Sequence, residues 1–165
     1  MQHKAWLREK AFTAVLTIVG VAFLFVGRLA FYPGCSLTER VLFPFSHANV
    51  FHLAANLLCL WMIKFPMRWP VAFLISFLTS FLPSPTWNLD GISQLPTCGL
   101  SGCIFASIGM RWGEFKEFKR MLRYAVLPTL ILGLAPNINT IFHLYNLFIG
   151  YLVFRLYDRK RTGNP

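Results

Sequence analysis

Long apolar runs, separated by short charged clusters, dominate the hydrophobic pattern of this chain. We expect six of these runs to form helices, judged against the roughly 20 residues that a spanning helix needs. Their approximate ranges are 11–31, 48–63, 69–83, 101–113, 121–135 and 139–157. A polar loop with prolines, residues 84–98, precedes the short fourth run. The pattern therefore predicts an all-α, polytopic membrane bundle in a single domain over residues 1–165.

The composition agrees with a protein of the lipid bilayer. Hydrophobic residues make up 56% of the chain and charged residues 13%, against about 25% charged residues in a soluble domain. The net charge of +10 comes from clusters between the apolar runs. Because these clusters form no basic stripe with interleaved aromatics and no zinc-finger spacing, nucleic acid is excluded as a partner. We expect no cleavable signal peptide, since no small-residue cleavage motif follows the first run.

The lysines and arginines set the expected orientation. With the N-terminus inside, all 16 of them except Arg28 and Arg40 fall in inner loops or at the termini. Cytoplasmic loops carry such an excess of cations, so both termini are expected in the cytoplasm. The compact chain favours a bacterial plasma (inner) membrane.

Four polar residues are expected near the middle of the bilayer. Ser101 precedes the inner cation Arg111 by a distance of about 15 Å along a helix, at 1.5 Å per residue. By the same measure His143 and His52 lie about 18 Å above the inner ends of their segments, and Asn56 about 12 Å. Polar groups at such depth are costly and therefore indicate a functional site.

The helical spacing places these residues on shared faces. His52 and Asn56 lie on one face of their segment, and His143, Asn146 and Gly150 lie on one face of the last segment. A further stripe of small residues, Gly102, Ala106 and Gly109, permits close packing of helices in lipid. The fourth and sixth segments are thus expected to approach each other.

A serine beside a histidine indicates nucleophilic catalysis. A hydroxyl attacks a carbonyl well only when a neighbouring base takes its proton, and imidazole has a suitable pKa. We therefore expect Ser101 as nucleophile and His143 as general base, with His52, Asn56 and the Ser101 backbone N–H stabilising the oxyanion. The acidic residues all lie near loops or ends: Glu9, Glu39, Asp90, Glu114, Glu117 and Asp158. The arrangement is therefore a dyad, which requires no cofactor and no metal.

Three blocks of the sequence together resemble the rhomboid family of intramembrane serine proteases. Residues 46–57, SHANVFHLAANL, are similar to the family's His-plus-HxxxN stretch. Residues 99–109, GLSGCIFASIG, are similar to its GxSG block, and residues 143–150, HLYNLFIG, to its HxxGxxxG block. The order and spacing agree across nearly the whole chain.

The resemblance implies the same roles for the polar residues. Ser101 is then the nucleophile, His143 the base, and His52 and Asn56 help to bind the oxyanion. Phe105 is expected to pack against the His143 ring. The implied partners are the lipid bilayer and transmembrane protein substrates, whose helix-breaking residues let a strand unwind toward the serine.

The blocks also depart from the family pattern. Gly99, Gly102 and Gly150 match it, but Asn146 replaces the first glycine of the last block, where it either loosens the dyad or hydrogen-bonds within it. In the first outer loop, Glu39-Arg40 stands where relatives often carry Trp-Arg. The spacing from this pair to His47 is one residue shorter than in those relatives.

Two alternatives and one pairing stay open. The first is an inactive rhomboid-like protein that binds membrane helices, which Asn146 favours. The second is a metal transporter that uses a set of histidines and cysteines. That set would be His47, His52, Cys59, Cys103 and His143. It is disfavoured because His47 and His52 lie about 140° apart around a helix. A disulfide between Cys35 and Cys98 and an interfacial role of His47 also stay open, and the sequence names no substrate or oligomeric state.

Overall fold

The computed structural model describes residues 2–27, 29–62, 68–88, 91–111, 127 and 137–162. Six helices occupy most of these residues. They are α1 (Gln2–Val26), α2 (Leu37–Leu42), α3 (Val50–Met62), α4 (Trp69–Thr79), α5 (Ser101–Met110) and α8 (Thr140–Thr162). All but α2 coincide with predicted apolar segments. The predicted segment 121–135 lies outside the described residues, apart from Leu127.

The helix bounds differ from the predicted ranges where backbone signals act. The first helix α1 begins at Gln2 and ends at Val26, not at residue 31. It ends there because Gly27 takes a φ of +105°, a conformation that stops a helix. Helix α4 ends at Thr79, before the predicted end at residue 83. Its start carries Pro70 in the first turn, where a missing N–H costs no helical hydrogen bond.

Two small elements in the segments between the longer helices were not predicted. Strands β1 (Thr86–Asn88) and β2 (Gly91–Ser93) pair antiparallel, with Trp87 opposite Ile92. They form a hairpin inside the segment expected as a polar loop. Helix α2 lies in the loop after α1. The fold is thus mostly helical, with one short hairpin.

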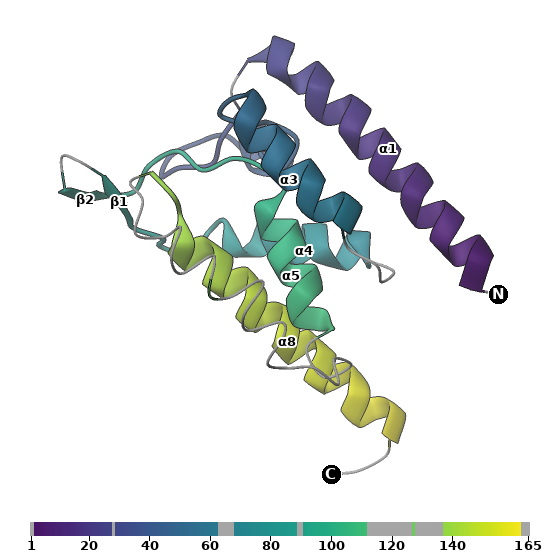
Figure 1. The fold of residues 1–165 in the computed structure, drawn as a ribbon. Helices are drawn as coiled ribbons and strands as arrows, with labels where there is room; N and C mark the ends of the chain where they lie inside the picture. The colour runs from purple at the N-terminus through teal and green to yellow at the C-terminus, as the bar shows by residue number, and fades with distance from the viewer. Residues whose placement is uncertain are drawn as a thin grey trace.

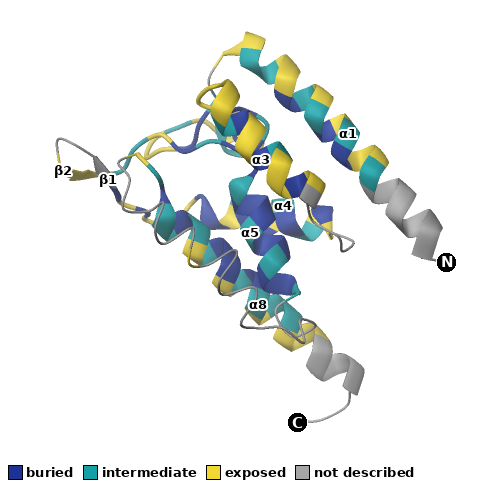
Figure 2. Ribbon diagram, viewed as in Figure 1, coloured by how far each residue is buried: buried dark blue, intermediate teal, exposed yellow. Residues whose placement is uncertain are grey.

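The helices α3, α5 and α8 run in the same general direction, and α1 runs the opposite way (Figure 1). Helix α5 lies at the centre and is buried along most of its length, whereas α1 shows much of its surface to the outside (Figure 2). The core around α5 includes Leu100, Cys103 and Ala106, all at 0% exposure. The start of α5 is therefore held inside the bundle.

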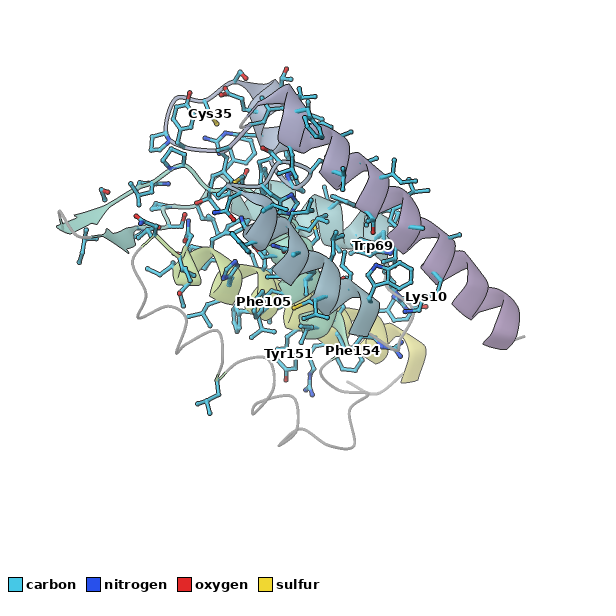
Figure 3. All side chains as sticks on the ribbon, turned by 45° about the horizontal axis from the view of Figure 1, so that its top comes forward. Lys10, Cys35, Trp69, Phe105, Tyr151 and Phe154 are labelled. Atoms are coloured by element: carbon cyan, nitrogen blue, oxygen red, sulfur yellow. The ribbon has the colours of Figure 1, made fainter. Side chains whose placement is uncertain are left out.

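The N-terminal helix packs on α3 and α4 along one side. Figure 3 labels Lys10 on α1 and Trp69 on α4 near one end of this contact. Lys10 donates to the Trp61 carbonyl at 3.0 Å, and the Phe12 and Trp69 rings lie 5.1 Å apart. The other side of α1 exposes large apolar side chains such as Ile18 and Phe25.

Of the helices that the structure describes, none is both long and apolar enough to cross a membrane. Five of the six predicted segments coincide with described helices, and their crossing of a membrane stays a prediction.

Three phenylalanines form a second, smaller core near the start of α8. The rings of Phe31 and Phe43 lie 4.7 Å apart, and Phe142 lies 4.8 Å from Phe31. Phe31 also pairs with Thr97 through two backbone hydrogen bonds of 2.9 and 3.0 Å. This core joins the segments that flank α2, and the segment before α5, to α8. The structure links no pair of the four cysteines, all of them described, by a disulfide.

Candidate active site

A tight turn presents Ser101 at the first position of α5. Gly99 takes a φ of +108°, a left-handed conformation that side chains with a Cβ rarely adopt. Its N–H donates to the Phe43 carbonyl at 2.9 Å. A Cβ at this position would lie 2.8 Å from the His52 ring. Glycine is therefore required twice, by the backbone and by the close approach of His52.

Ser101 and His143 meet across α5 and α8. The distance from Ser101 Oγ to His143 Nε2 is 2.8 Å, within the range of a good O–H···N hydrogen bond. When the serine hydroxyl donates to Nε2, the neutral imidazole carries its proton on Nδ1. This is the arrangement in which a histidine takes a proton from a serine.

Glycines make the close approach of α5 and α8 feasible. A Cβ added at Gly109 would overlap the backbone of Leu147. One added at Gly150 would overlap the carbonyl of Ala106. At the top of the contact, a Cβ at Gly102 would lie 2.7 Å from the Phe142 ring. The small residues predicted to form a stripe thus lie on the contact between the two helices.

Phe105 holds the imidazole plane. Its ring stacks on the His143 ring with centroids 4.9 Å apart and an interplanar angle of 20°. Phe105 comes from α5, one turn after Ser101, and its position between α5 and α8 can be followed in Figure 3. The serine and the surface that orients its base thus come from the same helix.

The residues of α3 lie beside this pair without bonding to it. The His52 ring is next to Gly99, and its Nδ1 accepts from the Ala48 N–H at 3.4 Å. Asn56 is buried, and its amide donates to the His52 carbonyl at 2.9 Å. The structure thus brings His52 to the serine turn, while the Asn56 amide is engaged by its own helix.

His47 lies behind His52. It is 3% exposed, and its Nδ1 lies 3.2 Å from the Phe45 carbonyl. Its ring meets the His52 ring edge-on at 5.2 Å. His47 therefore supports His52 and does not reach the serine.

The comparison with family models matches the Rhomboid domain over residues 34–154, which is most of the chain. The chain belongs to the rhomboid family. This result confirms the resemblance drawn from the three sequence blocks. The comparisons with curated proteins and with solved structures give no match. Rhomboid proteins are integral to the membrane and are generally serine proteases that act on transmembrane substrates within the bilayer.

Asn146 occupies a position where the resemblance to the rhomboid family expects glycine. Its side chain is 0% exposed, and its amide donates to the Phe142 carbonyl at 2.8 Å. Its Oδ1 is buried without a hydrogen-bond partner. The asparagine therefore fits into the packed bundle but leaves one acceptor unsatisfied.

Asn139 anchors the start of α8, a role that the sequence interpretation missed. Its Oδ1 accepts the Phe142 N–H at 3.0 Å, which caps the helix. Its amide donates to Ser84 Oγ at 3.0 Å and to Thr97 Oγ1 at 2.7 Å. An asparagine directly before a helix is a capping signal, but its two loop partners are distant in sequence.

The segment between α1 and α3 is held by Glu39 and Arg40, the residues that depart from the rhomboid pattern. Glu39 accepts from the Ser36 backbone N–H at 2.8 Å and from the Ser36 hydroxyl at 2.8 Å, which completes a capping box on α2. These hydrogen bonds, the backbone one first, lower the pKa of Glu39 from its usual value. Arg40 donates to the carbonyls of Ser80 and Tyr32. The loop is thus tied to the end of α4.

Among the described residues, no group of three or more His, Cys, Asp or Glu side chains lies close enough to hold a metal ion. The histidines and cysteines of the transporter alternative therefore form no such group in this part of the chain. The polar side chains that meet at the start of α5 are the Ser101 hydroxyl and the His143 imidazole.

Proposed function

We propose that this rhomboid protein is an intramembrane serine protease that works through a dyad of Ser101 and His143. The observation that carries the proposal is the 2.8 Å contact between Ser101 Oγ and His143 Nε2. The stacked Phe105 ring supports it, because it fixes the plane of the base. No cofactor or metal takes part.

The reaction begins with attack of Ser101 Oγ on the scissile carbonyl carbon. The hydroxyl proton passes to His143 Nε2, and the carbonyl oxygen becomes an oxyanion. When the carbon–nitrogen bond breaks, the imidazolium gives its proton to the leaving amine, which leaves an acyl-enzyme. Water then attacks the ester, its proton passes to His143, and the return of that proton to Oγ releases the carboxyl product.

Three donors stabilise the oxyanion in this proposal. The Ser101 N–H lies at the start of α5, where helix N–H groups and the helix dipole favour negative charge. The His52 ring is adjacent through Gly99, and the Asn56 amide lies one turn further along α3. For Asn56 the step requires that its amide leave the His52 carbonyl and turn toward the substrate.

The membrane arrangement is part of the same proposal. The chain forms a single domain with six crossing segments and both termini in the cytoplasm, in a bacterial plasma membrane. The common direction of α3, α5 and α8, opposite to that of α1, supports this topology (Figure 1). Substrates are transmembrane segments whose helix-breaking residues allow a strand to reach Ser101.

A second candidate function is that of an inactive member that binds membrane helices. The buried Asn146 at the glycine position and the engagement of Asn56 by its own helix favour it. The two candidates differ in whether Ser101 is chemically activated.

A fluorescent fluorophosphonate separates the two candidates, since it labels activated serines and requires no known substrate. The purified protein in mild detergent is expected to label, and Ser101→Ala and His143→Ala are expected not to label. Ser107→Ala is the matched control, because Ser107 is another serine of α5 that is buried at 1% exposure. A folded wild type that does not label would contradict the protease and favour the helix-binding function.

A further inference from the structure

Three buried polar atoms on α8 have no hydrogen-bond partner: Oγ1 of Thr140, Nδ1 of His143 and Oδ1 of Asn146. The inference concerns the last two. Buried polar groups are paired in most native proteins, so each such atom needs an explanation. His143 and Asn146 are three residues apart and therefore lie on the same face of the helix. The two orphaned atoms are neighbours on one surface.

The two atoms are also complementary in kind. If Ser101 donates to Nε2, then Nδ1 of the neutral ring carries a proton and is a donor. Asn146 Oδ1 is an acceptor only. A buried donor thus lacks an acceptor beside a buried acceptor that lacks a donor. Joining them satisfies both groups at once.

Helix geometry brings the two side chains to neighbouring turns, and the pairing requires the Asn146 amide to leave the Phe142 carbonyl. Side chains of a helix lean toward its N-terminus, so Asn146 points back to the turn that holds His143. Its amide already bonds to that turn, at the Phe142 carbonyl, 2.8 Å away. The terminal torsion of asparagine is soft and roughly two-fold. The imidazole plane is fixed by Phe105, so the amide is the group that turns.

We infer that Asn146 is a positioning residue whose Oδ1 accepts the Nδ1 proton of His143. The inference rests on the proposed protease function and deepens it. The bond holds His143 in the tautomer that leaves Nε2 free to take the serine proton. A neutral amide performs here the orienting task of a carboxylate without placing a charge inside the bundle. The dyad thereby becomes a Ser–His–Asn arrangement.

The tautomer of His143 is the direct readout of this bond. We would label the histidines with ¹⁵N and record NMR spectra of the protein in detergent, with the His143 signals assigned by their loss in His143→Ala. The wild type is expected to show His143 protonated at Nδ1. In Asn146→Ala the population protonated at Nε2 is expected to rise. Asn146→Asp keeps the acceptor oxygen and is expected to keep the Nδ1 tautomer.

The rate of fluorophosphonate labelling at Ser101 is the second readout. Asn146→Ala is expected to label about tenfold more slowly, the loss that one hydrogen bond of ordinary strength produces. Asn146→Asp is expected to recover most of that rate. Ser107→Ala, which removes another buried and unpartnered hydroxyl, is expected to change neither readout. If Asn146→Ala does not fold, Asn146→Gly gives the same comparison.

An Asn146→Ala protein with the wild-type tautomer and the wild-type rate would overturn the inference. So would faster labelling after Asn146→Gly, because the asparagine would then be an obstacle. Failure of the proposed function gives a different result. If the wild type does not label but its His143 tautomer still depends on Asn146, the bond between the two residues is supported and the protease function is contradicted.

Discussion

The two sides of Ser101 differ in how their polar groups are arranged. On the α8 side, His143 already contacts the serine oxygen at 2.8 Å, and glycines pack the two helices against each other. On the α3 side, His52 and Asn56 hydrogen-bond to the backbone near or within their own helix. The proposed base thus already contacts the serine, whereas the proposed oxyanion donors are engaged elsewhere.

This difference separates two tasks that a serine protease must perform. Proton transfer needs a fixed distance between nucleophile and base, and backbone packing supplies it on the α8 side. Oxyanion binding is needed only once charge develops. In the proposed mechanism the α3 donors therefore exchange helix bonds for substrate bonds as the oxyanion forms. Variants of the glycines in the α5–α8 contact are expected to act on folding, and variants of the α3 donors are expected to act on rate.

The largest effect is expected at the contact of α5 with α8. A Cβ at Gly150 would overlap the Ala106 carbonyl, and a Cβ at Gly109 would overlap the Leu147 carbonyl. Because backbone cannot move aside as a flexible side chain can, Gly150→Ala and Gly109→Ala are each expected to lower the free energy of unfolding by about 3 kcal/mol. Thermal unfolding in detergent measures this loss.

The control for this prediction is Ala54→Ser, at an exposed position of α3, which is expected to shift the midpoint little. If both glycine variants unfold at the wild-type midpoint, the α5–α8 contact is not tight. Backbone packing would then not be what fixes the distance between Ser101 and His143.

The second effect concerns rate more than stability. Asn56→Ala removes a proposed oxyanion donor and is expected to slow fluorophosphonate labelling about a hundredfold, the typical loss for one such donor. The unfolding midpoint is expected to fall less than in the glycine variants, because only one side-chain hydrogen bond within α3 is lost. A lower midpoint with an unchanged labelling rate would reverse these roles and make Asn56 a purely structural residue.

The third effect tests how the α8 side is anchored. Asn139→Ala removes the helix cap and two donors from a residue that is 6% exposed. The expected loss is about 2 kcal/mol in the free energy of unfolding, with faster amide hydrogen exchange at the start of α8. Asn139→Asp keeps the cap oxygen and is expected to recover part of the loss. Unchanged exchange in Asn139→Ala would show that the anchor is elsewhere.

The smallest effect is the pH dependence of the outer loop. The pKa of Glu39 is lower in the folded loop than its usual value, so its capping contribution is complete at pH values above the usual pKa. The contribution is lost as the pH falls through the lowered pKa of the folded state. The protection factors of the α2 amides, which correct for the intrinsic pH dependence of exchange, are expected to fall on acidification in that range. Glu39→Gln, which does not titrate, is expected to show no such fall.

The sequence predicted the parts of the site that depend on local spacing. The shared face of His143 and Gly150, and the small residues of α5, follow from helical periodicity alone. Most helix positions also follow from the apolar runs. The end of α1 at Val26 was missed because Gly27 stops the helix inside an apolar run, where hydropathy gives no signal.

The parts that were missed depend on contacts between distant segments. Asn139 bonds to Ser84 and Thr97, and no local pattern joins these residues. The hairpin of β1 and β2 lies in a short polar segment without a clear alternation. The engagement of Asn56 by the His52 carbonyl is local, but a shared face does not indicate which way an amide points. Placement and the Ser101–His143 contact were thus predictable, and these other hydrogen bonds were not.

The most direct test of the account is the site and rate of a single covalent adduct. Wild-type protein treated with a fluorophosphonate would be digested, and the modified peptide identified by mass spectrometry. The account predicts one adduct per chain, on Ser101, and none in His143→Ala at the same exposure. An adduct on another residue, or equal modification of Ser101 with and without His143, would contradict the claim that these two residues form a nucleophile and its base.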